Sequence, residues 1–176
     1  NSKFFQNSVV SQSIDSTLTG GGISIVFSRA IIKNSIIVGN FIVSSSSVQH
    51  AFIGGGGVFL SGENASALIV SADIRMNSAG HRGKGGGIFV ELGTSLTCHY
   101  SLIGFNSAVQ GGGLLADGSA SLTSCSIFNN SATDKGGGLF CVVTSSASST
   151  VKLILSNASF FDNVVNNTNP SAVGAS

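Results

Sequence analysis

The side chains that could do chemistry in this chain of 176 residues are few and widely separated. Carboxylates are the main candidates, since cleavage of a polysaccharide needs two or three of them on one surface, as acid, base or Ca²⁺ ligands. The sequence contains seven: Asp15, Glu63, Asp73, Glu91, Asp117, Asp134 and Asp162. Because no two are adjacent in the sequence, a catalytic site depends on whether the fold brings them together.

The histidines are weaker candidates. His81 belongs to a basic run, residues 81–84, that could bind an anionic glycan or simply form a solvated corner. His99 follows Cys98, but this pair has no further ligand at metal-binding spacing, and His50 stands alone. We expect no metal and no cofactor.

Charge is scarce throughout the chain. Charged residues make up 9% of the sequence, compared with about 25% in a typical globular domain. The net charge of +1 provides little attraction for nucleic acid or acidic lipid. Ser, Gly or Asn interrupts every apolar run, so none reaches the roughly 18 residues of a membrane-spanning helix. We therefore expect neither nucleic-acid binding nor direct membrane insertion.

An internal repeat organises the sequence. Each copy contains a Gly triplet, at residues 20–22, 55–57, 85–87, 111–113 and 136–138. Two apolar residues in alternation follow each triplet, in the pairs Ile23/Ile25, Val58/Leu60, Ile88/Val90, Leu114/Ala116 and Leu139/Cys141. An alternation with a period of two is typical of a β-strand with one buried face.

A recurring Asn provides a second marker, at Asn7, Asn40, Asn77, Asn106, Asn130 and Asn163. Large apolar residues stand three positions before it, at Phe4, Ile37, Ile74, Ile103, Ile127 and Phe160. Small residues stand five positions before it, at Ser2, Ser35, Ala72, Ser101, Cys125 and Ala158. Apolar or small residues also recur eight and ten positions before it. The pattern predicts two short half-buried strands before each Asn, separated by a one-residue phase shift, and a loop between the Asn and the next Gly triplet.

This repeat predicts an all-β fold, a right-handed single-stranded parallel β-helix (β-solenoid). Each repeat supplies three strands and three corners, and we expect about five coils in a single domain over residues 1–176. The right-handed winding follows from the strong preference for right-handed crossovers between parallel strands. Length variation is confined to residues 41–53, 61–65 and 142–150, where any specific recognition would lie.

The recurring Asn is predicted to form an inward structural ladder. An inward amide at a corner can bond unpaired backbone groups and also the equivalent Asn of the coils above and below, about 4.8 Å away. The Gly triplet permits a positive φ at the next corner and a close approach of adjacent backbones.

The predicted register separates the candidate chemical groups. No two of the seven carboxylates occupy the same position in adjacent coils, so we expect no catalytic site. The three cysteines, Cys98, Cys125 and Cys141, take inward positions as free thiols. Cys98 and Cys125 lie on neighbouring coils but three residues out of phase, which predicts that they are too far apart for a disulfide.

Four Asn-x-Ser/Thr sequons, at Asn64, Asn129, Asn157 and Asn166, are possible N-glycosylation sites in a secreted eukaryotic protein. Their number is about what the abundance of Asn, Ser and Thr gives by chance, so it identifies no compartment.

The pairing of a Gly-Gly-rich turn before an apolar residue with a later Phe-x-x-Asn resembles the polymorphic outer-membrane-protein repeats of bacterial autotransporter passengers. Residues 4–7 and 160–163 match the second motif literally, and the other four copies have Ile in place of Phe. Gly replaces the usual Ala of the first motif in every copy. The resemblance implies a surface-displayed β-helix used for adhesion or as a coat.

We therefore expect an extracellular or cell-surface structural or adhesive module, a scaffold or filament subunit without catalytic activity. Two alternatives remain open: a polysaccharide-active β-helix enzyme of the lyase or hydrolase type, and a module that binds glycans through its loops. Neither end of the sequence has an amphipathic helix, a charged strand or a Pro-rich segment that would cap the core. The expected partners are further coils of a longer chain or identical copies stacked end to end, besides glycans or host or cell-surface ligands.

Overall fold

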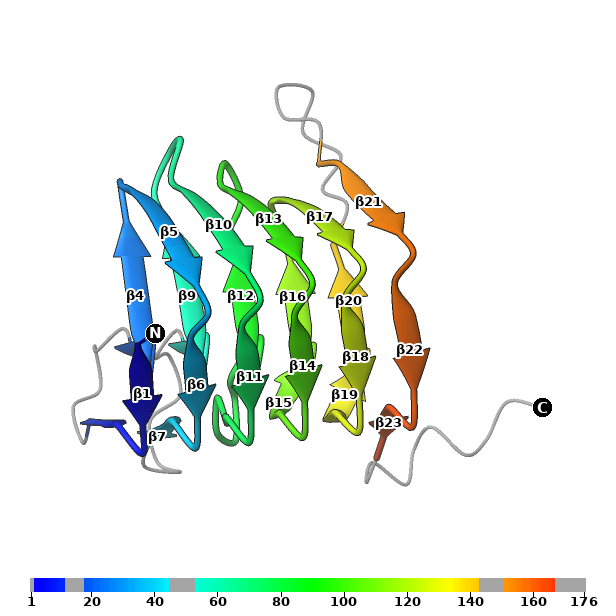
Figure 1. Cartoon of the computed structure of the whole chain (residues 1–176). Coiled ribbons are helices and arrows are strands. Elements are labelled where there is room, and N and C mark those ends of the chain that lie inside the picture. Colours follow the sequence, from blue (N-terminus) through cyan, green and yellow to red (C-terminus); the bar gives the residue numbers. More distant parts are fainter. Residues whose placement is uncertain (1, 12–17, 45–52, 143–150, 167–176) are drawn as a thin grey trace.

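The computed structural model describes residues 2–11, 18–44, 53–142 and 151–166, and within these ranges the chain forms β-strands and no helix. The strands lie in parallel sheets whose successive members come from successive repeats (Figure 1). The predictions of an all-β fold and of parallel strands are confirmed. Of the predicted loops at residues 41–53 and 142–150, residues 45–52 and 143–150 lie outside the described ranges, and residues 41–44 and 53 belong to strands. Residues 61–65 form a tight turn closed by a hydrogen bond from Ala65 N–H to the Gly62 carbonyl.

Three sheets carry most of the strand pairing, and all their neighbouring strands are parallel. Sheet 1 contains, in spatial order, β5 (Arg29–Lys33), β10 (Ser66–Val70), β13 (Ser95–His99), β17 (Ser119–Thr123) and β21 (Leu153–Ser156). Sheet 2 contains β1 (Lys3–Phe5), β6 (Ile36–Val38), β11 (Asp73–Arg75), β14 (Leu102–Gly104), β18 (Ser126–Phe128) and β22 (Ser159–Phe161). Sheet 3 contains β4 (Ile23–Val26), β9 (Val58–Ser61), β12 (Ile88–Val90), β16 (Leu114–Ala116) and β20 (Leu139–Cys141).

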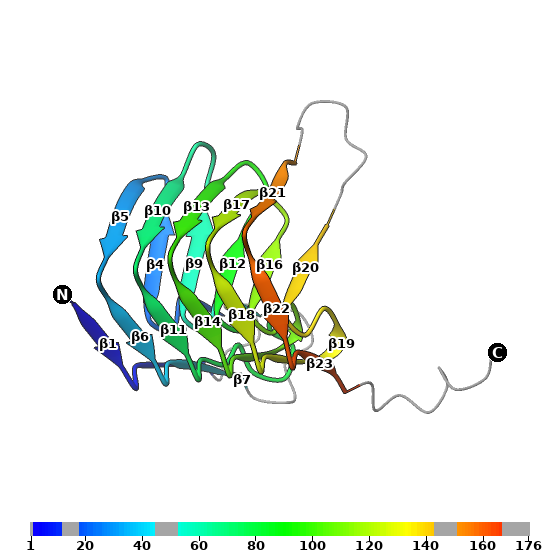
Figure 2. The ribbon, with the colours of Figure 1, turned by 45° about the vertical axis from the view of Figure 1, so that its right-hand side comes forward.

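Within one repeat the chain passes through the three sheets in turn. It runs along β5 in sheet 1 and β6 in sheet 2, crosses the segment after Asn40 and enters β9 in sheet 3. It then returns to sheet 1 as β10, directly beside β5. Figure 2 shows sheet 3 behind sheets 1 and 2, with each repeat one step farther along the molecule.

The strand register aligns the residues that the repeat places at equivalent positions. The inward column of sheet 2 is Phe4, Ile37, Ile74, Ile103, Ile127 and Phe160. The inward column of sheet 1 includes Ile32, Ile69, Cys98, Leu122 and Leu155. The inward column of sheet 3 includes Ile23, Val58, Ile88, Leu114 and Leu139. Away from the two ends of the stack these side chains are buried in one continuous core.

A second, smaller core lies on the other face of sheet 3. Phe59, Phe89 and Leu115 alternate with the main-core residues, and each is at most 3% exposed. The rings of Phe59 and Phe89 lie 5.5 Å apart between centroids. These residues occupy positions that the repeat pattern treats as outward, so the strands of sheet 3 are buried on both faces where they meet this cluster.

Three corners of the repeat are each made by a residue with a positive φ. Between sheets 1 and 2 these residues are Asn34, Ser71, Tyr100, Ser124 and Asn157, with φ of 47 to 52°. Directly before the recurring Asn they are Gln6, Gly39, Met76, Phe105, Asn129 and Asp162, with φ of 49 to 69°. At the third corner they are the first residues of the triplets, Gly20, Gly55, Gly85, Gly111 and Gly136, with φ of 59 to 70°. One left-handed residue turns the chain and interrupts the strand alternation, which explains the one-residue phase shift.

The segment after the recurring Asn is a strand, so the prediction of a loop there is wrong. β2 (Ser8–Ser11), β7 (Phe41–Ser44), β15 (Ser107–Gln110), β19 (Ser131–Lys135) and β23 (Val164–Val165) follow five of the Asn residues. Ser78 bridges to Phe41 and Ser107 after the sixth. The physical reason is an inward residue two positions after the Asn, buried at Ile42, Ala79, Ala108 and Ala132. Two shorter strands, β3 (Leu18–Thr19) and β8 (Ile53–Gly54), pair just before the Gly triplet.

Candidate functional site

The recurring Asn side chains form a hydrogen-bonded column at the corner that follows sheet 2. Asn106 Oδ1 accepts two hydrogen bonds from Asn77, one from the backbone N–H at 2.9 Å and one from Nδ2 at 3.0 Å. Asn106 Nδ2 donates one proton to Asn130 Oδ1 at 3.0 Å and the other to the Ile74 carbonyl at 2.9 Å. Every polar atom of this buried amide therefore has a partner.

The same pattern runs through all six positions. Hydrogen bonds link, in order, Asn7, Asn40, Asn77, Asn106, Asn130 and Asn163. The four central residues are at most 1% exposed, whereas Asn7 is exposed and Asn163 is half-buried. The two outer residues are less buried because each has a neighbouring repeat on one side only.

The second and third glycines of each triplet pack directly against this column and the next backbone. A Cβ on Gly112 would lie 2.3 Å from the Ser131 carbonyl oxygen and 2.5 Å from that of Gly137. A Cβ on Gly113 would lie 2.5 Å from the Gly138 carbonyl oxygen and 2.9 Å from Asn130 Nδ2. No side chain fits at either position, which explains why the sequence keeps three consecutive glycines rather than the single one that a corner requires.

Two carboxylates do occupy the same position in adjacent repeats, so the prediction that none do so is wrong. Glu91 and Asp117 directly follow Val90 and Ala116, which pair in sheet 3. Both carboxylates are half-buried, and Asp117 Oδ1 has no hydrogen-bond partner among the described residues. The pKa of Asp117 is raised, chiefly by burial and further by the nearby Glu91 carboxylate, against an opposing effect of Lys84.

The repeat alignment missed this pair because it was anchored on the recurring Asn. Glu91 and Asp117 stand at the same distance after their Gly triplets but at different distances before Asn106 and Asn130. An alignment anchored on the triplets would have found them.

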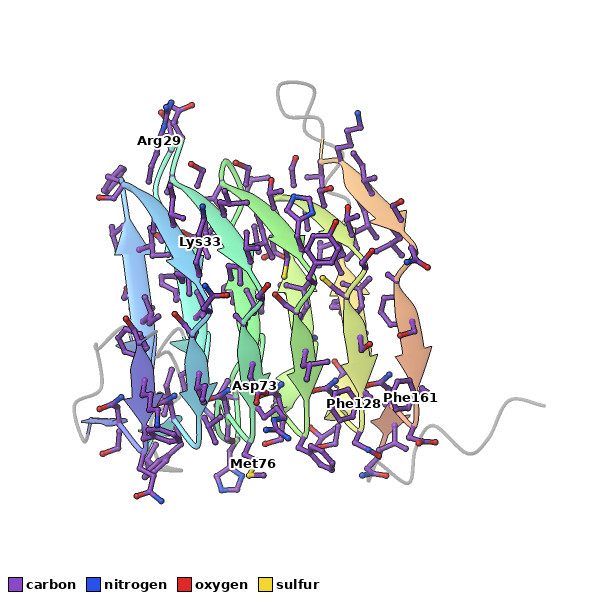
Figure 3. The ribbon with its side chains drawn as sticks, in the orientation of Figure 1. Arg29, Lys33, Asp73, Met76, Phe128 and Phe161 are labelled. Atoms are coloured by element: carbon purple, nitrogen blue, oxygen red, sulfur yellow. The ribbon has the colours of Figure 1, made fainter. Side chains whose placement is uncertain are left out.

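The other described carboxylates lie apart from this pair. Asp73 forms an ion pair with Arg75 on the outer face of β11, where Figure 3 labels Asp73. Asp134 Oδ2 accepts a hydrogen bond from Gln110 Nε2 at 2.8 Å. The remaining three are the exposed Glu63 and Asp162, and Asp15, which falls outside the described residues.

The basic run borders an open groove of about 430 Å³ on the face made by the segments after the recurring Asn. Its lining includes Phe41, Val43, Ser78, His81, Ser107 and Thr133. His81 is exposed. His50 lies outside the described residues, and the ring of His99 lies 6.1 Å from that of Tyr100 between centroids. The groove combines apolar, hydroxyl and imidazole groups, a set that can contact a sugar ring and its hydroxyls.

The sulfur atoms of Cys98 and Cys125 lie 3.6 Å apart, so the prediction that these residues are too far apart is wrong. Cys98 is on β13, and Cys125 is the first residue after the corner between β17 and β18. Both are free and buried, whereas Cys141 is free and half-buried. The two residues differ by three positions in the repeat, but a corner lies between these positions and turns the two side chains toward each other.

The four sequon asparagines, Asn64, Asn129, Asn157 and Asn166, are all exposed. Asn129 and Asn157 stand at corners with a positive φ, and Asn64 stands in the turn after β9. The Asn157 Nδ2 donates a hydrogen bond to the Ser124 hydroxyl at 3.2 Å. The Thr of the sequon at Asn166 lies outside the described ranges.

Aromatic rings stack on the outer face of sheet 2, a feature that the repeat pattern does not reveal. Phe128 and Phe161 lie next to each other on β18 and β22, with centroids 5.2 Å apart and planes 10° from parallel (Figure 3). Phe105 meets Phe128 edge-on at 5.4 Å. Gly104 leaves room for this arrangement, since a Cβ there would lie 2.6 Å from the Phe128 ring.

Within the described ranges, the core is open at both ends of the stack. At the end formed by β4, β5 and β1, a groove of about 360 Å³ is lined by Phe4, Ile23, Ile31, Ile32 and neighbouring polar residues. At the other end, Leu155 is 47% exposed and Phe160 is 41% exposed, whereas their equivalents in the preceding repeat are fully buried. Apolar cross-sections of the core are therefore exposed at both ends.

Among the described residues, no group of three or more His, Cys, Asp or Glu side chains could hold a metal ion. No helix in these ranges is long and apolar enough to cross a membrane. Comparison of the chain with protein-family models, with curated proteins and with solved structures finds no match.

Proposed function

We propose that the chain winds as a right-handed single-stranded parallel β-helix and serves as an extracellular or cell-surface scaffold. Three parallel sheets visited in a fixed order, each new strand pairing with its equivalent in the previous repeat, support this winding. The Asn column and the Gly triplets also favour it, because both depend on in-register stacking of equivalent positions. The Asn column and the Gly triplets stabilise the stacking of the repeats, so few positions of each repeat remain for ligand recognition.

The observation that carries the scaffold proposal is the pair of open core ends. Leu155 and Phe160 are exposed at one end, and a groove lined by Phe4 and other apolar residues lies at the other end. The strands at both ends of each sheet are edge strands. Open edges and apolar cross-sections favour the addition of a further strand layer unless they are capped or charged. Charged residues make up only 9% of the chain, so charge repulsion opposes such addition weakly.

A further coil of the same type fits these ends. It would continue the Asn column beyond Asn7 and Asn163 and would cover the exposed inward residues. The coil can come from a longer chain or from an identical copy stacked end to end, and both give an elongated structural element. The resemblance to polymorphic outer-membrane-protein repeats supports display at a cell surface, in a coat or an adhesive layer.

Sedimentation velocity of the 176-residue chain over a range of concentrations tests end-to-end association. We expect species that grow with concentration, and we expect the double variant Leu155→Lys/Phe160→Lys to remain monomeric because it places two charges on one open end. The matched control is Tyr100→Lys/Leu102→Lys, which adds the same charge to exposed residues in the middle of the stack. A monodisperse wild-type monomer at high concentration, or equal loss of association in the control, would contradict the proposal.

Polysaccharide cleavage is a second candidate function, favoured by Glu91 and Asp117. A carboxyl whose pKa is raised by burial, with a second carboxyl group nearby, is a typical acid and base arrangement for glycoside chemistry. Incubation with a panel of pectins and alginates, followed by measurement of reducing ends, tests it. Activity in the wild type that disappears in Asp117→Asn would favour the enzyme over the scaffold, and no release from any substrate would remove this candidate.

Glycan binding without cleavage would use the groove beside His81. The groove is open and lies across several repeats, which suits an extended chain of sugars. Binding to a glycan array that is lost in His81→Ala would support this adhesive form of the scaffold. Binding that persists in the variant would place the adhesive surface elsewhere.

A further inference from the structure

Cys98 and Cys125 interrupt two different columns of the core, and they do so in neighbouring repeats. The column of Cys98 otherwise holds only branched aliphatic residues: Ile32, Ile69, Leu122 and Leu155. The column of Cys125 otherwise holds only Ser and Ala: Ser2, Ser35, Ala72, Ser101 and Ala158. Each column contains one cysteine, and the two cysteines lie at positions where their sulfur atoms are in contact.

Local contacts show that the sulfur atoms are neighbours rather than separate core fillers. Their separation is 3.6 Å, and Cys125 Sγ lies 3.4 Å from the Cys98 carbonyl oxygen. Cys98 is fully buried and Cys125 is 1% exposed. A disulfide bond, at roughly 2.0 Å, requires the sulfurs to approach by about 1.6 Å from their present contact. The bond would leave no polar group unpaired, since it removes both S–H donors at once.

We propose that Cys98 and Cys125 form a disulfide that fastens two adjacent repeats to each other when the chain matures in an oxidising compartment. This inference rests on the proposed extracellular location, because cytosolic thiols remain reduced. The two thiols lose two protons and two electrons in forming the S–S bond. A low-molecular-weight disulfide such as oxidised glutathione accepts them and is released as two thiols, so atoms and electrons balance.

Because both sulfurs are buried in the folded chain, the exchange has to take place before the two repeats close on one another. One of the two thiols, as the thiolate, attacks the small disulfide. The other then displaces the small thiol from the mixed disulfide, which completes the S–S bond.

The link would change how the stack opens. It closes a loop between residues 27 positions apart and ties sheet 1 of one repeat to the sheet 1–sheet 2 corner of the next. In a stack of repeats that contact mainly their neighbours, end repeats can separate before the centre does. The disulfide would prevent the repeats that contain Asn106 and Asn130 from separating. We expect it to raise the melting temperature by roughly 5–10 °C.

Mass spectrometry of the chain secreted from eukaryotic cells tests the proposal. The protein is purified without reductant, unfolded in iodoacetamide and measured intact, and then digested to map cross-linked peptides. We expect one alkylated thiol, Cys141, and a cross-linked peptide that contains Cys98 and Cys125. Three alkylated thiols, or a bridge that involves Cys141, would overturn the inference.

Two variants complete the experiment. Cys141→Ser is expected to give no alkylation before reduction and two alkylations after it. Cys125→Ser, which introduces the residue found at this position in other repeats, is expected to give two alkylations and the lower melting temperature of the reduced wild type. The outcome is independent of end-to-end association, so a reduced pair in a chain that still assembles would refute the disulfide alone. A bridged pair in a strictly monomeric chain would refute the stacking alone.

Discussion

Replacement of Asn106 by Leu, a side chain of similar size, tests the energetic role of the Asn column. The change removes one amide and leaves two buried donors without partners: the backbone N–H of Asn77 and one Nδ2 proton of Asn77. The Ile74 carbonyl also loses the Nδ2 donor of Asn106. Each unpaired buried donor costs about 1–3 kcal/mol. We therefore expect the free energy of unfolding to fall by about 2–6 kcal/mol.

Urea unfolding followed by far-UV circular dichroism measures this loss. The matched control is Asn7→Leu at the exposed start of the column. There the change removes the Nδ2 donor to Asn40 Oδ1, but the backbone N–H of residue 7 still donates to that oxygen. We expect the control to cost less than about 1 kcal/mol. Equal losses at the two positions, or a loss below about 0.5 kcal/mol for Asn106→Leu, would refute the argument that the column stabilises the corners.

Three further predictions follow from the backbone, the carboxylate pair and the aromatic rings. Gly112→Ala is expected to prevent folding or to lower the melting temperature far more than Gly39→Ala. The new Cβ at residue 112 would meet two carbonyl oxygens, whereas a Cβ at residue 39 would meet no atom nearer than 3.5 Å. Gly39→Ala would therefore add only the strain of a left-handed backbone, about 1 kcal/mol. Thermal melts of both variants check this, and equal melting temperatures would contradict it. The pKa of Asp117 is higher in the folded chain than in the unfolded chain, so ionisation of this carboxyl lowers stability as pH rises through the folded pKa. Asp117→Asn should therefore raise the melting temperature at neutral pH and change it little near pH 3. An unchanged melting temperature at both pH values would count against the burial of this carboxyl. Phe128→Ala is expected to cost about 1–2 kcal/mol in urea unfolding, because it removes both ring contacts on the outer face of sheet 2, and a neutral effect would show that these contacts add no stability.

The register of this fold could be predicted from the sequence because both markers are irreplaceable. The third Gly of a triplet touches the column, as Gly113 touches Asn130, so neither residue tolerates substitution. Both markers therefore recur along the chain, although the number of residues between them varies. The alternation of Ile23 and Ile25, and of its equivalents, then assigns the buried face of each strand. Parallel pairing of equivalent residues follows from these features alone.

Contacts between different columns could not be read from the same pattern. Cys98 and Cys125 differ in phase by three residues, yet the left-handed residue at Ser124 turns the chain so that the two sulfurs meet. Phase along a strand says which residues share a column, but the angle of each corner decides which columns touch. The carboxylate pair was missed for another reason, since segments of different length separate Glu91 and Asp117 from the next Asn.

The strand after each recurring Asn leaves only a weak apolar pattern in the sequence. The inward residue is Ala at residues 79, 108 and 132, and a small side chain contributes little to an apolar pattern. Ile42 is the only large one among the buried members of this position. The outer stack of Phe105, Phe128 and Phe161 had no signal, because its members come from two different positions of the repeat.

Fibre diffraction from aligned assemblies of the 176-residue chain tests the scaffold most directly. In a parallel β-helix extended through its ends, the strands run across the long axis and the coils repeat along it. We therefore expect elongated particles with a reflection near 4.8 Å along the particle axis, and shorter or absent particles in Leu155→Lys/Phe160→Lys. A 4.8 Å reflection perpendicular to the particle axis, or association that the end variant leaves unchanged, would contradict this expectation.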